Sequence, residues 1–220
     1  MNWEKSKALT SLKYDFLVSF FKQRQDFFLT GGSALGIFYF DHRYSYDLDL
    51  FTEKDIDWHF LELLFVSISE EIKAEYRIIT KAPFFHRYEL TRDKDREIID
   101  FVIDKVPQLD KEKNKFDIIK VDTPFEIGIN KICTLLSRSE LKDLIDLYFL
   151  VQNGFDVKGN IENAKQKDGG VEPAIISYLL SGLVISEPPD YMIKEVSIGE
   201  LERFISNLKS IMADISFPPK

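Results

Sequence analysis

The stretch from residue 27 to residue 51 constrains the fold more than any other part of the chain. It begins with a short apolar segment that predicts a strand, turns at a pair of glycines, and continues as an apolar segment that predicts a helix. A polar loop then leads into a second predicted strand that carries two aspartates. In order, the segments are Phe27–Thr30, Gly31-Gly32-Ser33, Ala34–Phe40, the loop Asp41–Ser45 and the strand with Asp47-Leu48-Asp49.

The two aspartates predict a cation site. Side chains alternate between the faces of a strand, so Asp47 and Asp49 project to the same side. Two carboxylates on one face repel each other unless a cation lies between them. Mg²⁺ prefers such oxygen ligands and is commonly held by one or two carboxylates plus substrate phosphates, and Mn²⁺ accepts similar ligands. The alternative is a solvated edge strand that has no ligand.

The glycine turn predicts a phosphate site at the other end of the same stretch. Gly31 and Gly32 allow a positive φ and a close approach of the backbone to a ligand. A helix that starts at Ser33 directs its free N–H groups and its dipole at the turn, which favours an anion. Ser33 either caps that helix or donates its hydroxyl to a phosphate. Together, turn and carboxylates predict a site for a nucleoside triphosphate with its magnesium; an ordinary turn is the alternative.

A further carboxylate lies in a predicted hairpin of two strands, Phe84–Thr91 and Glu97–Ile103. Asp100 interrupts the apolar second strand. A carboxylate in such a strand is costly unless it is paired or bound to a cation. The alternative is an edge strand on which Asp100 faces water, and Glu89 and Asp104 are the competing acids if the register differs.

The second half of the chain predicts helices, two of which carry charged side chains. The first carries Lys131, and the second carries Lys142, Asp143 and Asp146. The spacing of Asp143 and Asp146 puts both carboxylates on one helical face, with Lys142 beside them. The two helices are expected at residues 123–137 and 140–151.

Composition limits the class of protein. The chain has 220 residues, 45% of them apolar, and a net charge of −8. This charge argues against a protein that coats nucleic acid non-specifically, because phosphate neutralisation needs clustered lysine and arginine. No apolar run is long enough to cross a membrane, and no leader segment opens the chain. The single cysteine, Cys133, excludes an intramolecular disulfide and favours a cytoplasmic setting.

These motifs resemble those of known proteins. The glycine turn, the helix and the Asp-x-Asp strand resemble nucleotidyltransferases of the DNA polymerase β type, and the longer string resembles the AbiEii/AbiGii toxin family. A lysine helix that ends in Arg138 and a basic-Asp-x-x-Asp helix resemble the later motifs of that family. Lys142 stands where arginine is usual, and lysine keeps the charge without the bidentate fork. The longer string consists of Gly31, Gly32, Ser33, Ala34, Leu35, His42, Arg43, Ser45, Asp47, Leu48, Asp49 and Phe51.

The resemblance implies a fold and a reaction. The expected fold is α+β, with a polymerase β-like nucleotidyltransferase core of mixed sheet and flanking helices at residues 1–121 and a helical part at residues 122–220. The expected reaction is attack of an acceptor hydroxyl on the α-phosphorus of an NTP, with release of pyrophosphate. Members of the family have been linked to GTP and to tRNA 3′ ends, so RNA is the leading acceptor. A protein hydroxyl or a small molecule is another possibility, and an antitoxin protein is an expected partner.

The resemblance also assigns roles to the metal site. Asp47 and Asp49 would hold one or two Mg²⁺ ions, and Asp100 would complete the metal site and take the proton of the acceptor hydroxyl. Arg43 would contact a phosphate or the acceptor, and Ser45 would shape the loop before the acidic strand.

The remaining roles concern the phosphates of the nucleotide. Gly31, Gly32 and Ser33 would hold the phosphates, and Lys131 would neutralise the leaving pyrophosphate. Asp143 would fix Lys131 or the nucleotide, and Lys142 and Asp146 would be further nucleotide contacts. Two alternatives stay open. The charged residues of the two helices form only a structural ion-pair cluster, or the whole chain is a non-catalytic module that binds a nucleotide or a partner.

Overall fold

The computed structural model describes residues 2–137, 140–185, 187 and 189–217. The chain divides into two compact units. Unit 1 comprises residues 1–107 and 111–123, and unit 2 comprises residues 108–110 and 124–220. The division therefore falls between Thr123 and Pro124, whereas a boundary after residue 121 was expected. The assignment of separate roles to the two parts stays a prediction.

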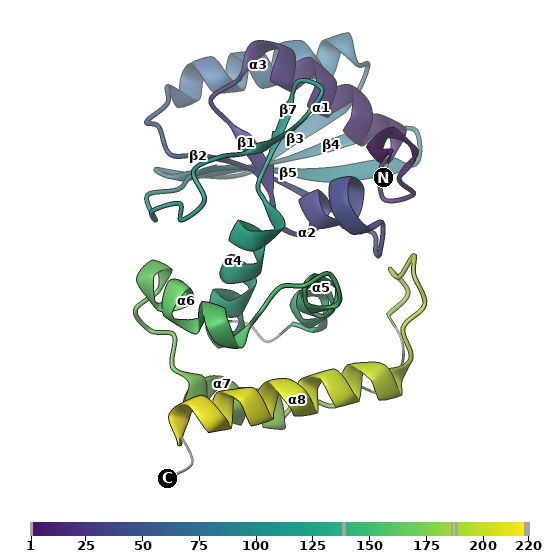
Figure 1. The fold of residues 1–220 in the computed structure, drawn as a ribbon. Coiled ribbons are helices and arrows are strands. Elements are labelled where there is room, and N and C mark those ends of the chain that lie inside the picture. The colour runs from purple at the N-terminus through teal and green to yellow at the C-terminus, as the bar shows by residue number, and fades with distance from the viewer. Residues whose placement is uncertain (1, 138–139, 186, 188, 218–220) are drawn as a thin grey trace. The chain divides into compact units, whose positions relative to one another are not determined.

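Unit 1 is built on a seven-stranded mixed sheet in the order β3-β4-β5-β2-β1-β7-β6 (Figure 1). β2 runs parallel to β5 and β1 runs parallel to β7, while the other neighbours are antiparallel. The expected α+β fold with a mixed sheet and flanking helices is confirmed. The strands are β1 (Phe28–Thr30), β2 (Asp47–Thr52), β3 (Glu75–Ala82), β4 (Phe85–Arg92), β5 (Asp95–Ile103), β6 (Asn114–Phe116) and β7 (Ile119–Val121).

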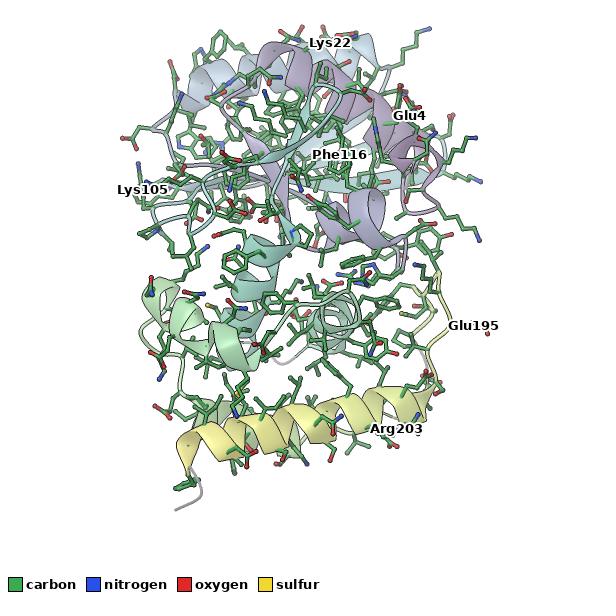
Figure 2. The ribbon with its side chains drawn as sticks, viewed as in Figure 1. Glu4, Lys22, Lys105, Phe116, Glu195 and Arg203 are labelled. Atoms are coloured by element: carbon green, nitrogen blue, oxygen red, sulfur yellow. The ribbon has the colours of Figure 1, made fainter. Side chains whose placement is uncertain are left out.

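Two amphipathic helices, α1 (Ser11–Gln23) and α3 (Trp58–Glu71), cover one face of this sheet (Figure 1). The core beneath them is aromatic. The ring of Phe101 on β5 lies 5.4 Å from the ring of Phe20 on α1 and 6.0 Å from that of Phe65 on α3. Such ring pairs add to the free energy gained from burial. Figure 2 shows side chains filling the space between the sheet and the two helices. The face of β5 that carries Phe101 is thus the one that packs against α1 and α3.

The glycine turn continues directly into helical structure. The short helix α2 (Gly31–Ala34) begins at Gly31 with Thr30 as its N-cap, and it passes into a π-helical turn, η2 (Leu35–Phe40). The expectation that Ser33 caps the helix is wrong, because Ser33 lies inside the first turn. η2 ends at Asp41, whose φ of +48° is left-handed. Figure 1 shows α2 on the side of the sheet away from α1 and α3.

Unit 2 is helical. The carboxylate of Glu126 is buried within this unit, where it accepts the backbone N–H groups of Leu109, at 3.1 Å, and Asp110, at 2.8 Å, and pairs with Lys167. In the part of the chain that the structure describes, no helix is both long and apolar enough to span a membrane. The elements are α4 (Pro124–Ser137), α5 (Leu141–Gln152), η3 (Lys158–Asn160), α6 (Ile161–Lys167), α7 (Pro173–Ser181) and α8 (Ile198–Ser216).

Candidate active site

The two aspartates of β2 lie on one face of the strand, as the alternation of side chains predicts. Leu48 and Leu50 are fully buried on the opposite face, while Asp47 and Asp49 are half-buried. The leucines share the face covered by α1 and α3, so the aspartates point to the other side of the sheet. The sequence thus predicted the acidic face correctly.

Asp100 joins this face from the neighbouring strand. β5 pairs with β2 in parallel, and Asp100 is the register partner of Asp49. Register partners project to the same side of a sheet, and Phe101 occupies the opposite face of β5. β5 lies between β4 and β2, and Asp100 is only 4% exposed. The alternative of a water-facing edge strand is therefore wrong.

Arg87 on β4 is the side chain that binds Asp100. The two residues are register partners in the antiparallel β4–β5 pair. Arg87 Nε donates to Asp100 Oδ1 at 2.7 Å, and Nη2 donates to Oδ2 at 2.6 Å. These bonds raise the pKa of the guanidinium above its usual value, and the charges of Asp47 and Asp49 raise it further. Arg87 therefore lies in the field of all three carboxylates.

Arg87 was not among the predicted site residues, although the hairpin and the apolar strand around Asp100 indicate such a partner. The cost of burying Asp100 required a cation, and a hairpin with its turn near residue 94 places Arg87 opposite Asp100. The competing acid Glu89 has its own partners, because it pairs with Arg77 at 3.1 Å and with Arg96.

The donor atoms of this face fit a hard divalent cation in part. Asp47 and Asp49 supply, on one face, the carboxylate oxygens that Mg²⁺ prefers, and Asp49 lies against Gly31. Among the described residues, no three His, Cys, Asp or Glu side chains are grouped closely enough to hold a metal ion. Both oxygens of Asp100 bond to Arg87 instead. The structure thus places the three predicted ligands on one face without assembling them around a common point.

The glycine turn and the acidic strand are fixed to each other. Gly31 has a φ of +71°, and a Cβ atom on it would lie 2.4 Å from Asp49 Oδ2, which is closer than atoms can pack. The hydroxyl of Ser33 donates to the backbone carbonyl of Asp47. Gly32 is buried beside them. Ser33 therefore connects the helix to the acidic strand, and its predicted contact with a phosphate stays a prediction.

The loop before β2 is more buried than a polar sequence suggests. His42 is fully buried, and Arg43, which is 4% exposed, donates from Nη1 to the carbonyl of Tyr44 at 2.9 Å. The carbonyl of Ser45 accepts a hydrogen bond of 2.6 Å from Nζ of Lys13. Ser45 thus contributes to the shape of the loop through its backbone. A ligand contact of Arg43 stays a prediction.

Lys13 is a second residue that sequence reasoning missed. It lies on α1 and is buried, and its Nζ is 3.1 Å from Oε2 of Glu97 at the start of β5. Burial raises the pKa of Glu97, and the charge of Lys13 opposes that rise. One ammonium group therefore joins the loop before β2 to the start of β5. No sequence spacing indicates this contact, because its partners are far apart in the chain.

In unit 2 the predicted helix pair forms a buried ion cluster. Lys131 on α4 lies 2.7 Å from Asp143 and 2.6 Å from Asp146 on α5, and all three side chains are at most 8% exposed. Lys142 on α5 instead pairs with Glu140 at the surface, at 2.9 Å. The ion pairs of Lys131 with Asp143 and Asp146 are those that the cluster interpretation predicts. Whether Lys131 also contacts a triphosphate stays a prediction. Arg138 lies outside the described residues.

Comparison with known proteins identifies the family. Residues 15–209 match the family model described as "Nucleotidyl transferase AbiEii toxin, Type IV TA system". The chain belongs to the AbiEii nucleotidyltransferase family. The resemblance expected from the sequence motifs is thereby confirmed. No curated protein matched this AbiEii-family sequence.

Two solved structures share the fold of this AbiEii-family chain. A candidate nucleotidyltransferase from H. pylori is 18% identical with a TM-score of 0.63, and the match covers 98% of this chain and 93% of that one. The protein JHP933 from Helicobacter pylori is 17% identical with a TM-score of 0.59, and the match covers 93% and 89% of the two chains. At these identities the similarity establishes the fold, whereas activity is inferred from the family.

Proposed function

We propose that this chain transfers a nucleoside monophosphate from an NTP to an acceptor hydroxyl, with release of pyrophosphate, in a reaction that depends on a divalent cation. Family membership supports nucleotidyl transfer. The observation that carries the proposal is the position of Asp47 and Asp49, which lie on the face of β2 away from the core, with Asp49 against the glycine turn.

The acidic face and the glycine turn would bind different parts of the nucleotide complex, the cation and the phosphates. Asp47 and Asp49 would hold the cation, which when bound stabilises charge on phosphate oxygens. Gly31 and Gly32 would let the backbone approach the phosphates closely. The start of α2 would place backbone N–H groups against them, and Ser33 keeps this turn fixed to Asp47.

Asp100 and Lys131 are assigned to the acceptor and to the leaving group. Asp100 shares the face of Asp49 and would accept the proton of the attacking hydroxyl. Lys131 would neutralise the negative charge that develops on pyrophosphate. Asp143 and Asp146 hold its ammonium in place within unit 2.

The toxin description of the family guides which acceptor, nucleotide and partner to test first. We propose a toxin that acts in the cytoplasm against RNA, with tRNA as the first acceptor to test and GTP as the first nucleotide, and an antitoxin protein as partner. Mg²⁺ is the first cation to test and Mn²⁺ the second.

A second candidate is a nucleotide-binding module that does not turn over. The bidentate pair between Arg87 and Asp100 favours it, because a carboxylate held in this way is not available as a metal ligand or as a base.

One transfer experiment separates the two candidates. The protein is incubated with Mg²⁺, each α-³²P-labelled NTP in turn, and total tRNA, and label in RNA is followed on gels. We expect transfer that falls by at least about a hundredfold in Asp47→Asn and in Asp49→Asn, as expected for loss of an electrostatic group at the reacting phosphate. Lys94→Ala, at the exposed turn before β5, is the control and should retain activity. Binding of labelled NTP without transfer to RNA, protein or small-molecule fractions would support the module.

A further inference from the structure

The Arg87–Asp100 pair is an arrangement that the proposed chemistry does not use. Asp100 lies in the interior of the sheet, and its side chain is 6% exposed, whereas the Arg87 side chain is 39% exposed. Both carboxylate oxygens accept hydrogen bonds from one planar guanidinium, at 2.7 and 2.6 Å. Such bidentate, charge-assisted pairs are among the stronger polar contacts in proteins.

The pair meets an electrostatic need of this face. Asp47, Asp49 and Asp100 project to the same side of two neighbouring strands, so their charges repel. Two other arginines, Arg77 and Arg96, are engaged with Glu89. In the part of the chain that the structure describes, the ion pair of Asp100 is the one with Arg87, whose positive charge balances the carboxylate.

A metal ion at Asp100 and this bidentate pair exclude each other. A divalent cation such as Mg²⁺ binds carboxylate oxygens at about 2.0–2.1 Å and demands near-octahedral geometry. The guanidinium of Arg87 occupies the region in front of both Asp100 oxygens. A metal ion on the same carboxylate would lie close to this positive charge, and the two would repel strongly. The ion can therefore bind Asp100 only after Arg87 releases at least one of the two oxygens.

We propose that Arg87 is an internal counter-ion that competes with the divalent cation for Asp100, and so sets how tightly the acidic face binds metal. This inference rests on the proposed function, because it assumes a metal at that face. Arg87 is a positioning residue in this scheme. It holds Asp100 in place while no ion is bound, and it would have to release that carboxylate for Asp100 to serve as a metal ligand.

The surroundings of Arg87 allow this exchange. Its side chain is partly exposed, so the guanidinium can leave Asp100 for water without opening the core. The ring of Phe85 lies 5.5 Å from Cζ of Arg87. An aromatic ring at this distance attracts a guanidinium, so this contact can keep Arg87 on the same face of the sheet when it leaves Asp100.

Binding of Mn²⁺ in the absence of nucleotide tests the competition. Free Mn²⁺ is measured by electron paramagnetic resonance in titrations of the full chain, so the readout does not involve activity. We expect Arg87→Ala to bind Mn²⁺ roughly tenfold more tightly than the wild type, since it frees Asp100 and removes a nearby positive charge. Arg87→Gln is a second neutral variant of similar length and should also bind more tightly.

Two further variants separate competition from a general charge effect. Arg77→Ala removes an arginine that pairs with Glu89 on the adjoining strand, and its Mn²⁺ affinity should stay within about twofold of the wild type. In the double variant Arg87→Ala with Asp100→Asn, most of the gain should disappear, because the two residues act through one contact.

Each outcome decides the inference. Unchanged or weaker Mn²⁺ binding in folded Arg87→Ala or Arg87→Gln overturns it while leaving the metal proposal intact, provided that Asp47→Asn abolishes binding. A gain that persists fully in the double variant, or an equal gain in Arg77→Ala, also overturns it. Mn²⁺ binding that does not depend on Asp47 would overturn the metal site itself and this inference with it.

Discussion

The carboxylate of Asp49 fills the space in which a side chain at Gly31 would lie, with Oδ2 only 2.4 Å from the Cβ position. The glycine turn and the acidic strand are thus parts of one packed unit. A ligand that binds at the glycine turn would therefore lie beside the carboxylate of Asp49.

Gly31→Ala should therefore weaken both the fold and the site. Alanine at a φ of +71° costs about 1–2 kcal/mol, and the methyl group must also displace Asp49. We expect a loss of stability of at least this size in urea unfolding and a loss of Asp47-dependent Mn²⁺ binding. Gly199→Ala is the matched control. It lies in α8 with nothing within 4 Å of the new methyl group, and it should stabilise by up to about 1 kcal/mol. A Gly31→Ala protein with unchanged stability would contradict the packing described here.

The cluster around Lys131 predicts a large loss of stability on truncation. Lys131→Met leaves Asp143 and Asp146 buried side by side without the ammonium between them. Removing one member of a buried ion cluster typically costs about 3–5 kcal/mol. Lys142→Ala removes a lysine that pairs with Glu140 at the surface, so its effect on urea unfolding should stay below about 1 kcal/mol. Similar losses in the two variants would show that the cluster carries little of the stability of unit 2.

Lys13→Met should give a loss of stability that depends on pH. Burial already raises the pKa of Glu97 above its unfolded pKa of 4.5. The carboxyl group therefore contributes stability below pH 4.5, and this contribution is lost as the pH rises through the higher pKa of the folded state. Without Lys13 the pKa should rise further. Unfolding in urea should therefore show a larger difference between variant and wild type at neutral pH than at pH 4.5. Lys94→Met, at the exposed turn before β5, is the control. A loss that is equal at both pH values would exclude Glu97 as its cause.

The ring of His86 stacks on Trp58, with 3.8 Å between the ring centroids, and provides an optical test. Burial lowers the pKa of His86 below the ordinary 6.5, and the charge of Lys81 lowers it further. Because the pKa of His86 is lower in the folded state than in the unfolded state, neutral His86 contributes stability above pH 6.5. This contribution is lost as the pH falls through the pKa of the folded state. Protonation should change the fluorescence of Trp58 with a midpoint below 6.5, and His86→Gln should abolish this transition. His59→Gln, one residue from Trp58 on α3, should retain it; a transition that survives in His86→Gln would assign it to another group.

The sequence predicted the mixed sheet with its flanking helices, and it predicted the aspartates and the glycine turn of the candidate site. The alternation of Asp47 and Asp49 with Leu48 and Leu50 sufficed to place the acids on the outer face, because strand geometry fixes that alternation locally. The glycine turn was predicted for the same reason, since φ preferences act within a few residues. The start of the helix was misplaced, because the hydroxyl of Ser33 bonds to the backbone of Asp47 on a neighbouring segment and not to its own helix.

Only the tertiary structure decided which charges meet. Arg87 binds Asp100 across a hairpin, Lys13 joins the loop at Ser45 to Glu97, and Lys131 bridges two helices. Alternation and capping are short-range properties that a sequence displays directly. Pairing of charges depends on register and on burial, which are set by the packing of the whole sheet and its helices. The sequence by itself therefore determined which face of β2 carries the aspartates, and the tertiary structure decided which cations balance the carboxylates.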